Sequence, residues 1–267
     1  MARNRPIVMG ILNVTPDSFS DGGRWHDLDD AVRHGIELHA AGADFVDVGG
    51  ESTRPGAERV GEDEEQARVL PVVEALLRRG VHVSVDTMRA STARLAADAG
   101  AAIINDVSGG LADPEMHAVI AAAEVDYVAM HWTSLDHARR HSDVVREVRG
   151  EIKQRLAELI VHGVDQNRVI VDPGIGFAKT AEENWRLLGH LEALAKLGPR
   201  VLVGVSRKRF LAALVEADAP PSARDAATAT ISALAAQAGA WGVRVHDVAS
   251  TRATLDVWQA WERGAAS

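Results

Sequence analysis

The stretch IVMGILNVTPDSFSDGG, residues 7–23, is the most informative about the fold, because six apolar residues lead directly into a polar segment with proline and glycine. A run as short as residues 7–12 does not make an ordinary helix, and its continuous apolar character is typical of a strand buried on both faces of a parallel sheet. Seven further short apolar runs cover residues 45–48, 81–85, 101–104, 125–130, 169–171, 201–205 and 243–245. We therefore predict eight buried strands.

Segments with helical spacing lie between these runs. Residues 29–41, 64–79 and 144–161 carry apolar side chains three or four positions apart, and residues 223–238 are dense in alanine. The repeat from strand to strand averages about 33 residues, the size of a βαβ unit. Alternating strands and helices imply a parallel sheet, and eight units favour a closed (β/α)8 TIM barrel of the α/β class over an open doubly wound sheet. We expect a single domain over residues 1–267.

Composition argues against several classes of protein. Of the 267 residues, 46% are hydrophobic and 25% are charged, and no apolar run reaches the roughly 18 residues of a membrane span. The count of 0 cysteines excludes disulfides, zinc–thiolate sites and cysteine nucleophiles. Because the first residues do not resemble an export signal, we expect a cytoplasmic protein. A net charge of −9 disfavours nucleic acid as a partner, since that needs a basic face.

Polar residues gather where the predicted strands end. Asn13, Asp86, Asn105, Asp172 and His246 each follow an apolar run. In a (β/α)8 barrel the carboxyl ends of the strands meet at one mouth, where catalytic side chains collect. A single aspartate at a strand end is usually a helix cap, but eight polar ends together are better explained as the lining of one pocket. Other histidines show no partner pattern and are interpreted as surface residues, namely His34, His39, His117, His137, His141 and His162.

The last two strand ends are cationic. Ser206-Arg207-Lys208 follows the seventh run and opens a predicted helix, and Arg244 and His246 lie two positions apart, where both can face the same way. Loops after the seventh and eighth strands often bind phosphate in this fold. We therefore expect a site for a phosphate or diphosphate here, and the alternative is a salt-bridged surface cluster.

Three further polar residues are expected to converge, since Asp86, Asn105 and Asp172 end the third, fourth and sixth runs. Such a set could hold a hard metal ion, or it could bind a flat heterocycle rich in hydrogen-bond donors. Met130 and Phe177 could supply apolar faces for such a ring, or could simply pack in the barrel. The residues by themselves leave these alternatives open.

Five segments resemble the signatures of the dihydropteroate synthases, with most similarity to actinobacterial members. They are MGILNVTPDSFSDGG (residues 9–23), GGESTRPGA (49–57), DPGIGFAKT (172–180), VSRKRF (205–210) and VRVHDV (243–248). They occur in the order typical of the family, and the resemblance spans essentially the whole chain. Family members are (β/α)8 barrels that condense 6-hydroxymethyl-7,8-dihydropterin diphosphate with para-aminobenzoate. The resemblance therefore implies a transferase of folate biosynthesis that releases 7,8-dihydropteroate and diphosphate.

The resemblance also implies roles for individual residues. The catalytic set would be Asp86, Asp172, Lys208, Arg244 and His246. Pterin would be bound by Asp86, Asn105, Met130, Asp172, Phe177, Lys208 and Arg244. The para-aminobenzoate site would be bordered by Pro16, Phe19, Thr53, Pro55, Phe177, Ser206 and Lys208. Diphosphate would be bound by Asn13, Arg244 and His246, with the cofactor Mg²⁺ held against Asn13, and the loops that close over the substrates would contain Asp17, Ser20 and Arg54.

The implied mechanism is dissociative, because diphosphate leaves before the amine attacks. Sulfonamides are expected to compete with para-aminobenzoate, and the resemblance implies a homodimer. One alternative is a related barrel that transfers a methyl group from methyltetrahydrofolate to a corrinoid. A second alternative is an inactive pterin-binding paralogue. The first should lack Thr53-Arg54-Pro55, and the second should have lost residues such as Asn13 or Lys208; all of these are present.

Overall fold

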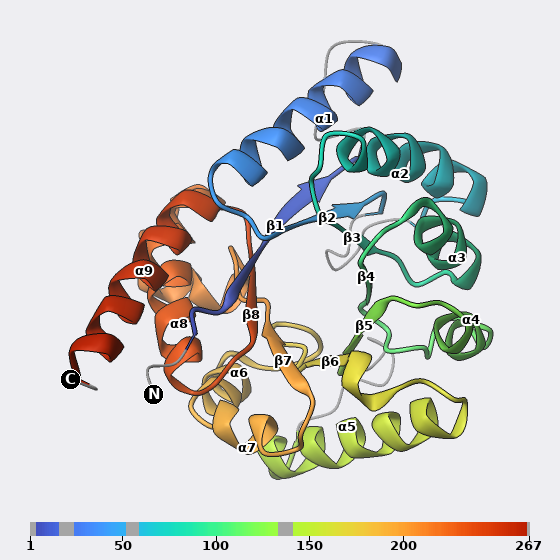
Figure 1. Cartoon of the computed structure of the whole chain (residues 1–267). Coiled ribbons are helices and arrows are strands. Elements are labelled where there is room, and N and C mark those ends of the chain that lie inside the picture. The colour runs from blue at the N-terminus through green and yellow to red at the C-terminus, as the bar shows by residue number, and fades with distance from the viewer. Residues whose placement is uncertain (1–3, 16–23, 52–58, 133–140, 266–267) are drawn as a thin grey trace.

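Eight strands pair in parallel in the computed structural model, and the last strand closes on the first (Figure 1). The structure describes residues 4–15, 24–51, 59–132 and 141–265. The strands are β1 (Ile7–Asn13), β2 (Phe45–Gly49), β3 (Val83–Asp86), β4 (Ile103–Asp106), β5 (Asp126–Met130), β6 (Val169–Asp172), β7 (Arg200–Val203) and β8 (Gly242–Val245). Ile7 pairs with Gly242 and Gly10 pairs with Val245, which closes the cylinder. The predicted (β/α)8 barrel is confirmed.

The helices form a ring outside the strands (Figure 1). They are α1 (Arg24–Ala40), α2 (Glu62–Leu77), α3 (Ala90–Ala99), α4 (Met116–Ala122), α5 (Val144–Val161), α6 (Ala181–Leu188), α7 (Leu191–Ala195), α8 (Asp225–Gln237) and α9 (Val248–Ala265). The main hydrophobic core fills the space between this ring and the outer faces of the strands. In the described part of the chain, the helices are all too short or too polar to cross a membrane.

The segment after β7 differs from the prediction. In place of an α-helix that opens at residues 206–208, the structure has a short 3₁₀ helix, η4 (Arg209–Leu214). Arg207 has a left-handed φ of 59°, and Lys208 is extended with a ψ of 150°, so helical dihedral angles begin only at Arg209. A second 3₁₀ helix, η5 (Pro221–Arg224), leads into α8. The cationic strand end is therefore a turn rather than a helix N-terminus.

An apolar plug fills the axis of the barrel. It consists of Met9, Ile103, Val128, Ile170 and Leu202, which form a buried cluster separate from the main core. Since side chains alternate along a strand, the residues two positions further toward each strand's carboxyl end also point inward, above the plug. The inward positions above the plug include Asn105, Met130, Asp172 and Gly204. The plug closes the barrel below and leaves the polar side chains at the carboxyl mouth.

Candidate functional site

An ion-pair network of buried carboxylates and a half-buried arginine crosses the barrel mouth. Arg244 Nε donates to Asp47 Oδ2 at 2.6 Å, and its Nη2 donates to Asp86 Oδ2 at 2.8 Å. Asn105 Nδ2 donates to the same Asp47 oxygen at 3.0 Å. Asp47 is 0% exposed, and Asp86 and Asn105 are also buried. The network joins β8 to β2, β3 and β4, and it brings together three of the predicted site residues.

The low exposure of this network changes its acid–base properties. Burial raises the pKa of Asp86 to about 7, an effect that Arg244 opposes and Asp47 reinforces. Asp47 Oδ1 is buried and has no hydrogen-bond partner among the described residues. A buried carboxylate oxygen without a donor is costly. This oxygen is therefore suited to accept a hydrogen bond from a bound molecule or from water.

Asp172 and Lys208 face the same space from β6 and from the turn after β7. Asp172 Oδ1 accepts a hydrogen bond from the Gly174 N–H at 2.7 Å, which orients the carboxylate at the strand end. Lys208 Nζ donates to the Ile175 carbonyl and lies 4.4 Å from the centre of the Phe177 ring, a cation–π distance. Burial lowers the pKa of Lys208 to about 7, against the effect of Asp172. Burial also raises the pKa of Asp172, which Lys208 opposes.

The two groups of side chains meet at Gly204, directly after β7. A Cβ atom at this position would lie 3.5 Å from Asp172 Oδ2 and 3.9 Å from both Arg244 Cβ and Lys208 Nζ. A larger side chain there would occupy the space between the two groups. The mouth thus offers carboxylate, amide and ammonium groups around one opening, which suits a flat ligand with hydrogen-bond donors and acceptors along one edge.

The expected anion site is not a cluster of unpaired cations. Arg207 Nε and Nη2 donate to both carboxylate oxygens of Asp225 at 2.9 and 2.8 Å, so this cation already has a carboxylate partner. The reason is tertiary, because the chain returns Asp225 at the start of α8 to the strand end. His246 stays at the mouth, where its Nδ1 lies 2.9 Å from Ser206 Oγ. The same hydroxyl oxygen accepts the backbone N–H of His246 at 3.1 Å.

The remaining predicted residues fall into three groups. Asn13 is half-buried at the end of β1 and pairs with Gly49 of β2. Met130 ends β5 and is buried, on the inward side of its strand. The third group lies outside the described residues and comprises Pro16, Asp17, Phe19, Ser20, Thr53, Arg54 and Pro55.

Asp106, which also ends a strand, has a structural role. Its carboxylate accepts hydrogen bonds at 2.7 Å from the backbone and hydroxyl of Ser108, from the Gly110 N–H and from the Tyr127 hydroxyl. Burial raises the pKa of Asp106, and these hydrogen bonds oppose the shift. The carboxylate therefore caps the turn after β4 and does not join the network at the mouth.

Two of the histidines that were expected at the surface have side chains that are largely covered. His117 is 7% exposed, and its ring packs against that of His162 with 5.1 Å between the ring centres. The side chain of His141 is 5% exposed, and its Nδ1 lies 3.1 Å from Glu183 Oε1. Both are covered by partners distant in sequence or on a neighbouring helix, which a local pattern does not show.

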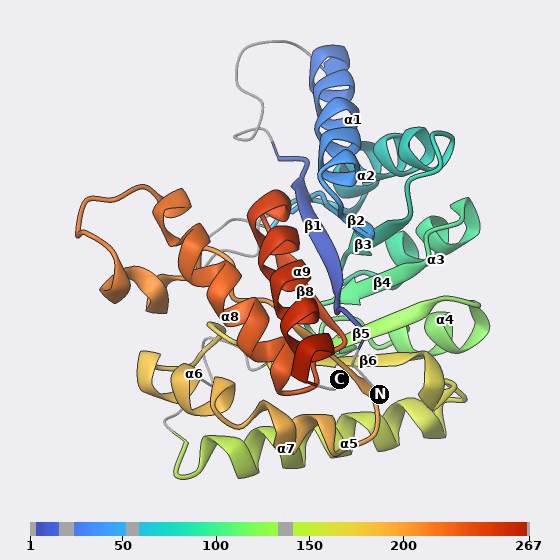
Figure 2. The same cartoon turned by 60° about the vertical axis from the view of Figure 1, so that its left-hand side comes forward.

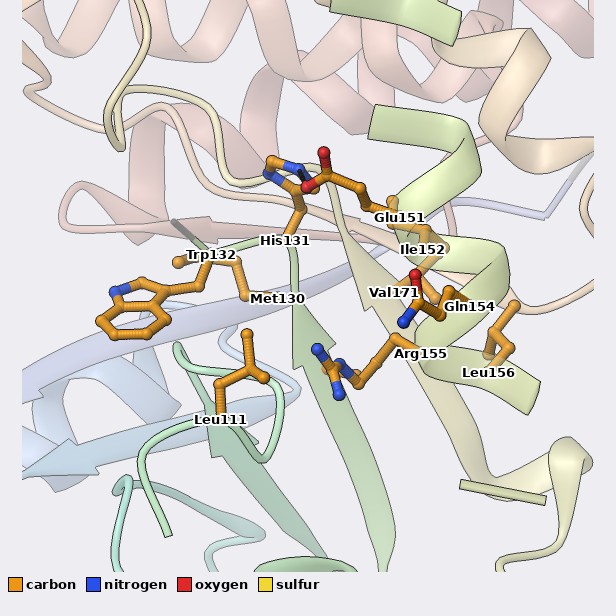
Figure 3. Close-up of a pocket in the computed structure, with 11 residues that line it drawn as sticks. Leu111, Met130, His131, Trp132, Glu151, Ile152, Gln154, Arg155, Leu156 and Val171 are labelled. Carbon is orange, nitrogen blue, oxygen red and sulfur yellow. Dashed lines mark hydrogen bonds and ion pairs between the residues drawn. The ribbon is translucent and has the colours of Figure 1, made fainter. Parts of the chain in front are cut away.

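A pocket of about 290 Å³ lies on the outer side of the barrel, between α5 and strands β5 and β6 (Figure 3). Its lining combines His131, Trp132, Glu151 and Arg155 with apolar side chains. Asp47, Asp86 and Arg244 are not among the lining residues. The pocket therefore does not include the ion-pair network, although Met130, a predicted pterin residue, is among its lining residues.

Sequence reasoning missed Asp47, although the site is built on it. The residue lies within the run of residues 45–48, which was interpreted only as a buried strand. Its signal is a lone charge in an otherwise apolar strand, because such a charge must find a buried partner. Lys179 and His131 were also missed as interacting residues, and their Nζ and Nδ1 atoms lie 3.0 Å apart.

Similarity to known proteins agrees with this geometry. Residues 9–246 match the family described as pterin binding enzymes. The chain is 51% identical over 263 residues to the dihydropteroate synthase of Mycobacterium leprae, an actinobacterium, with 95% of this chain and 93% of that protein covered. The fold matches dihydropteroate synthase from Xanthomonas albilineans with 4-aminobenzoic acid, at a TM-score of 0.92 and 45% identity over 97% of this chain and 94% of the other. For the complex of the same enzyme with 7,8-dihydropteroate, the TM-score is 0.89 and the identity 42%, with the same coverage. The chain therefore belongs to the pterin-binding enzymes and, within them, to the dihydropteroate synthases.

Proposed function

We propose that this protein condenses 6-hydroxymethyl-7,8-dihydropterin diphosphate with para-aminobenzoate to give 7,8-dihydropteroate and diphosphate, as a transferase of folate biosynthesis. The observation that carries the proposal is the convergence of Asp86, Asn105, Asp172 and Lys208 at one barrel mouth, in a chain of this family. The relatives from Xanthomonas albilineans, which bind 4-aminobenzoic acid and 7,8-dihydropteroate, support the same substrates here.

The mouth supplies the groups that a pterin requires. The amino-pyrimidinone edge of a pterin presents parallel N–H donors, which a carboxylate can accept in pairs. Asp86 and Asp172 provide carboxylates, Asn105 provides an amide, and Lys208 provides donors for the ring carbonyl and nitrogen acceptors. Asp47 Oδ1, which is buried without a partner among the described residues, offers one more acceptor beside them.

The proposed reaction exchanges one bond for another at C9 of the pterin. The C–O bond to diphosphate breaks, the electron pair leaves with the diphosphate, and positive charge spreads into the dihydropterin ring. The carboxylates of Asp86 and Asp172 stabilise that charge. The neutral amine of para-aminobenzoate then forms the C–N bond and loses one proton. His246 and Asn13 lie at the mouth for the diphosphate, and Arg244 contributes a fixed positive charge below them.

The donor set at the mouth fits magnesium. Mg²⁺ commonly takes one or two protein oxygens and completes its shell with water and substrate phosphates. Asn13 offers such an oxygen, and among the described residues no three histidine or acidic side chains gather into a metal site made of protein alone. We propose that Asn13 holds Mg²⁺ together with the diphosphate. When bound, Mg²⁺ neutralises charge on the leaving diphosphate.

We also propose a cytoplasmic homodimer that associates through α8 and α9. These helices pack against each other on the outside of the barrel (Figure 2). Three large apolar side chains on them are exposed, namely Leu234 (61%), Val257 (69%) and Trp261 (77%). Contiguous exposed apolar surface is typical of protein interfaces. The cytoplasmic location rests on the 0 cysteines, and cell fractionation tests it.

The direct test of function mixes purified protein with the pterin diphosphate, para-aminobenzoate and Mg²⁺. We expect 7,8-dihydropteroate and diphosphate to form in equal amounts, as measured by chromatography and a phosphate assay. We expect sulfonamides to inhibit, and excess para-aminobenzoate to relieve the inhibition. If the pterin diphosphate binds but neither product forms, the synthase proposal fails in favour of an inactive pterin-binding protein.

Asn13→Ala is expected to weaken Mg²⁺ and diphosphate binding together, because the Asn13 oxygen would hold the Mg²⁺ through which the diphosphate binds. The Mg²⁺ concentration for half-maximal rate should rise about tenfold, the effect of losing one charge-assisted contact. Calorimetry of diphosphate binding with and without Mg²⁺ gives a readout independent of turnover. The matched control is Asn167→Ala at an exposed position of η3 (Gln166–Arg168). An unchanged metal dependence would remove Asn13 from the metal site.

Pterin affinity is expected to fall as the pH drops below about 7. Burial raises the pKa of Asp86 to about 7, so acid converts the required carboxylate into the neutral acid. Because one proton competes with the ligand, affinity should fall roughly tenfold for each pH unit well below 7. Titration with 6-hydroxymethylpterin over roughly pH 5 to 7.5 measures this. Asp86→Asn should bind more weakly and flatten the profile, and an identical slope in this variant would contradict the assignment.

The dimer proposal predicts that Trp261→Glu yields a monomer in sedimentation velocity, because a buried charge would destabilise the interface. The matched control is Val161→Glu on α5, where the wild-type side chain is 84% exposed. A wild-type protein that sediments as a monomer, or a variant that stays dimeric, would contradict this interface.

A further inference from the structure

The loop between β6 and α6 is tightly curled and is held by two lysines. Gly174, Gly176 and Ala178 all have left-handed φ angles, of 66°, 82° and 49°. Three carbonyl oxygens of this loop accept hydrogen bonds from lysine side chains. Lys208 donates to the carbonyl of Ile175, and Lys179 donates to those of Gly174 at 3.0 Å and Phe177 at 3.2 Å.

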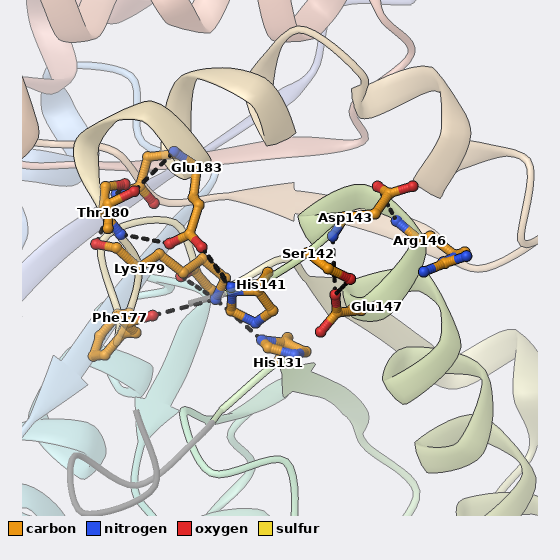
Figure 4. A network of polar contacts seen from close by, with 12 residues as sticks. His131, His141, Ser142, Asp143, Arg146, Glu147, Phe177, Lys179, Thr180 and Glu183 are labelled. Carbon is orange, nitrogen blue, oxygen red and sulfur yellow. Dashed lines mark hydrogen bonds and ion pairs between the residues drawn. The ribbon is translucent and has the colours of Figure 1, made fainter. Parts of the chain in front are cut away.

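Lys179 has a third partner, which extends the contact to α5. Its Nζ lies 3.0 Å from His131 Nδ1, so the three N–H bonds of the ammonium are matched by three acceptors (Figure 4). Since lysine donates, His131 Nδ1 accepts and Nε2 carries the ring proton. That proton is donated to Glu151 Oε2 at 2.9 Å. We call Lys179, His131 and Glu151 the lysine relay.

The electrostatics agree with these roles. Burial lowers the pKa of His131, so the neutral ring that the relay requires is favoured; Glu151 opposes this shift and Lys179 adds to it. Burial lowers the pKa of Lys179 to about 8, and Asp172, Glu151 and Glu183 favour its charged form. The ammonium therefore remains mostly protonated at neutral pH, although it is buried.

The far end of the loop is fixed by the start of α6. Thr180 Oγ1 accepts from the Glu183 N–H at 3.2 Å, and Glu183 Oε2 accepts from the Thr180 N–H at 2.7 Å, which makes a capping box. Glu183 Oε1 also accepts the backbone N–H of His141 at 2.9 Å (Figure 4). The Gly176 N–H also donates to Asn184 Oδ1 at 2.6 Å, and the Phe177 N–H donates to the Gly174 carbonyl at 3.1 Å. The lysine contacts add to these bonds in the middle of the loop.

The middle of this loop carries Phe177 to the mouth, where its ring faces Lys208. Family resemblance places Phe177 beside both the pterin and para-aminobenzoate. Lys179 itself hydrogen-bonds to the backbone of the loop and to His131. Its effect on the reaction would therefore pass through the position of Phe177.

We propose that Lys179, held by His131 and Glu151, is a positioning residue that sets Phe177 for para-aminobenzoate. This inference rests on the proposed function and adds to it a residue that positions the second substrate's binding site. Asp86 and Asn105, which would bind the pterin edge, make their contacts with Asp47 and Arg244 on other strands. Asp172, Lys208 and Phe177 connect part of the pterin site to this loop. Because Asp86 and Asn105 are held separately, loss of the relay should affect the second substrate more than the pterin.

The relay can be altered from outside the barrel mouth. The side chain of Glu151 is 41% exposed, on α5 at the edge of the outer pocket (Figure 3). Removing its carboxylate changes a half-exposed side chain on α5 that is not part of the ion-pair network. Glu151→Ala thus perturbs the relay without a large risk of unfolding, whereas Lys179→Met changes a buried group directly.

The experiment compares Lys179→Met, Lys179→Arg and Glu151→Ala with wild type. Lys153→Met is the matched control, because Lys153 is exposed on α5. Steady-state kinetics give kcat and the KM for para-aminobenzoate, and a fluorescence titration gives the Kd for 6-hydroxymethylpterin. Hydrogen exchange of the peptide covering residues 173–179 reports directly on the loop.

Lys179→Met should raise the KM for para-aminobenzoate about tenfold, as expected for the loss of hydrogen bonds to a charged group. The Kd for 6-hydroxymethylpterin should change less than about threefold, and exchange of the loop should become faster. Lys179→Arg should restore much of the KM, since it keeps a charged donor. Glu151→Ala should raise the KM about threefold, and Lys153→Met should match wild type.

Four results would overturn the proposal. The first is a folded Lys179→Met variant with a wild-type KM. The second is an equal loss of pterin and para-aminobenzoate binding, which would indicate general damage to the fold. The third is an unchanged KM for para-aminobenzoate in Glu151→Ala, which decides against the relay if Lys179→Met does not fold. An inactive wild-type protein would contradict the proposed function. In that case the positioning role is tested by hydrogen exchange alone, and the fourth result, unchanged exchange of the loop in Lys179→Met, would overturn it.

Discussion

The buried pairing of Arg244 with Asp47 and Asp86 is the interaction on which the rest of the site depends. It links residues 197 and 158 positions apart in the chain, so it exists only once the barrel has closed. The carboxylates of Asp47 and Asp86 are buried, so they require a cation, because an uncompensated buried charge is costly. The same contacts that satisfy the charge also orient Asp86 and, through Asp47, Asn105.

The mouth therefore holds ionisable side chains whose burial is unfavourable, and keeps them in fixed positions. Asp86, Asp172 and Lys208 all have pKa values moved by burial toward their neutral forms, and each shift is opposed by a neighbour of opposite charge. Groups in this balance respond strongly to a bound ligand, since a new hydrogen bond or charge alters which form is favoured. A substrate that brings both donors and acceptors would complete the network.

The backbone of the turn after β7 and of the β6–α6 loop is the second constraint on the site. The turn after β7 directs Arg207 to Asp225 and Lys208 toward the β6–α6 loop, although the two residues are adjacent. The left-handed φ of 59° at Arg207 separates the directions of these side chains. Lys208 contacts the loop from this turn, and Lys179 contacts it from within the loop. The backbone that carries the Phe177 ring is therefore held at several of its carbonyl oxygens.

The amino-acid sequence by itself determined the barrel, because eight short apolar runs separated by helical segments satisfy the burial of parallel strands, and strand-end residues such as Asp86, Asn105 and Asp172 follow from that register. It did not reveal that Asp47 lies at the centre of the site, since an acidic residue in an apolar run indicates the need for a buried partner but not which residue that partner is. Nor could it separate Arg207 from Lys208, or assign Asp106 to a turn rather than to the mouth. Those outcomes were decided only by the tertiary structure, because a buried charge takes its role from partners that chain closure brings within hydrogen-bond distance.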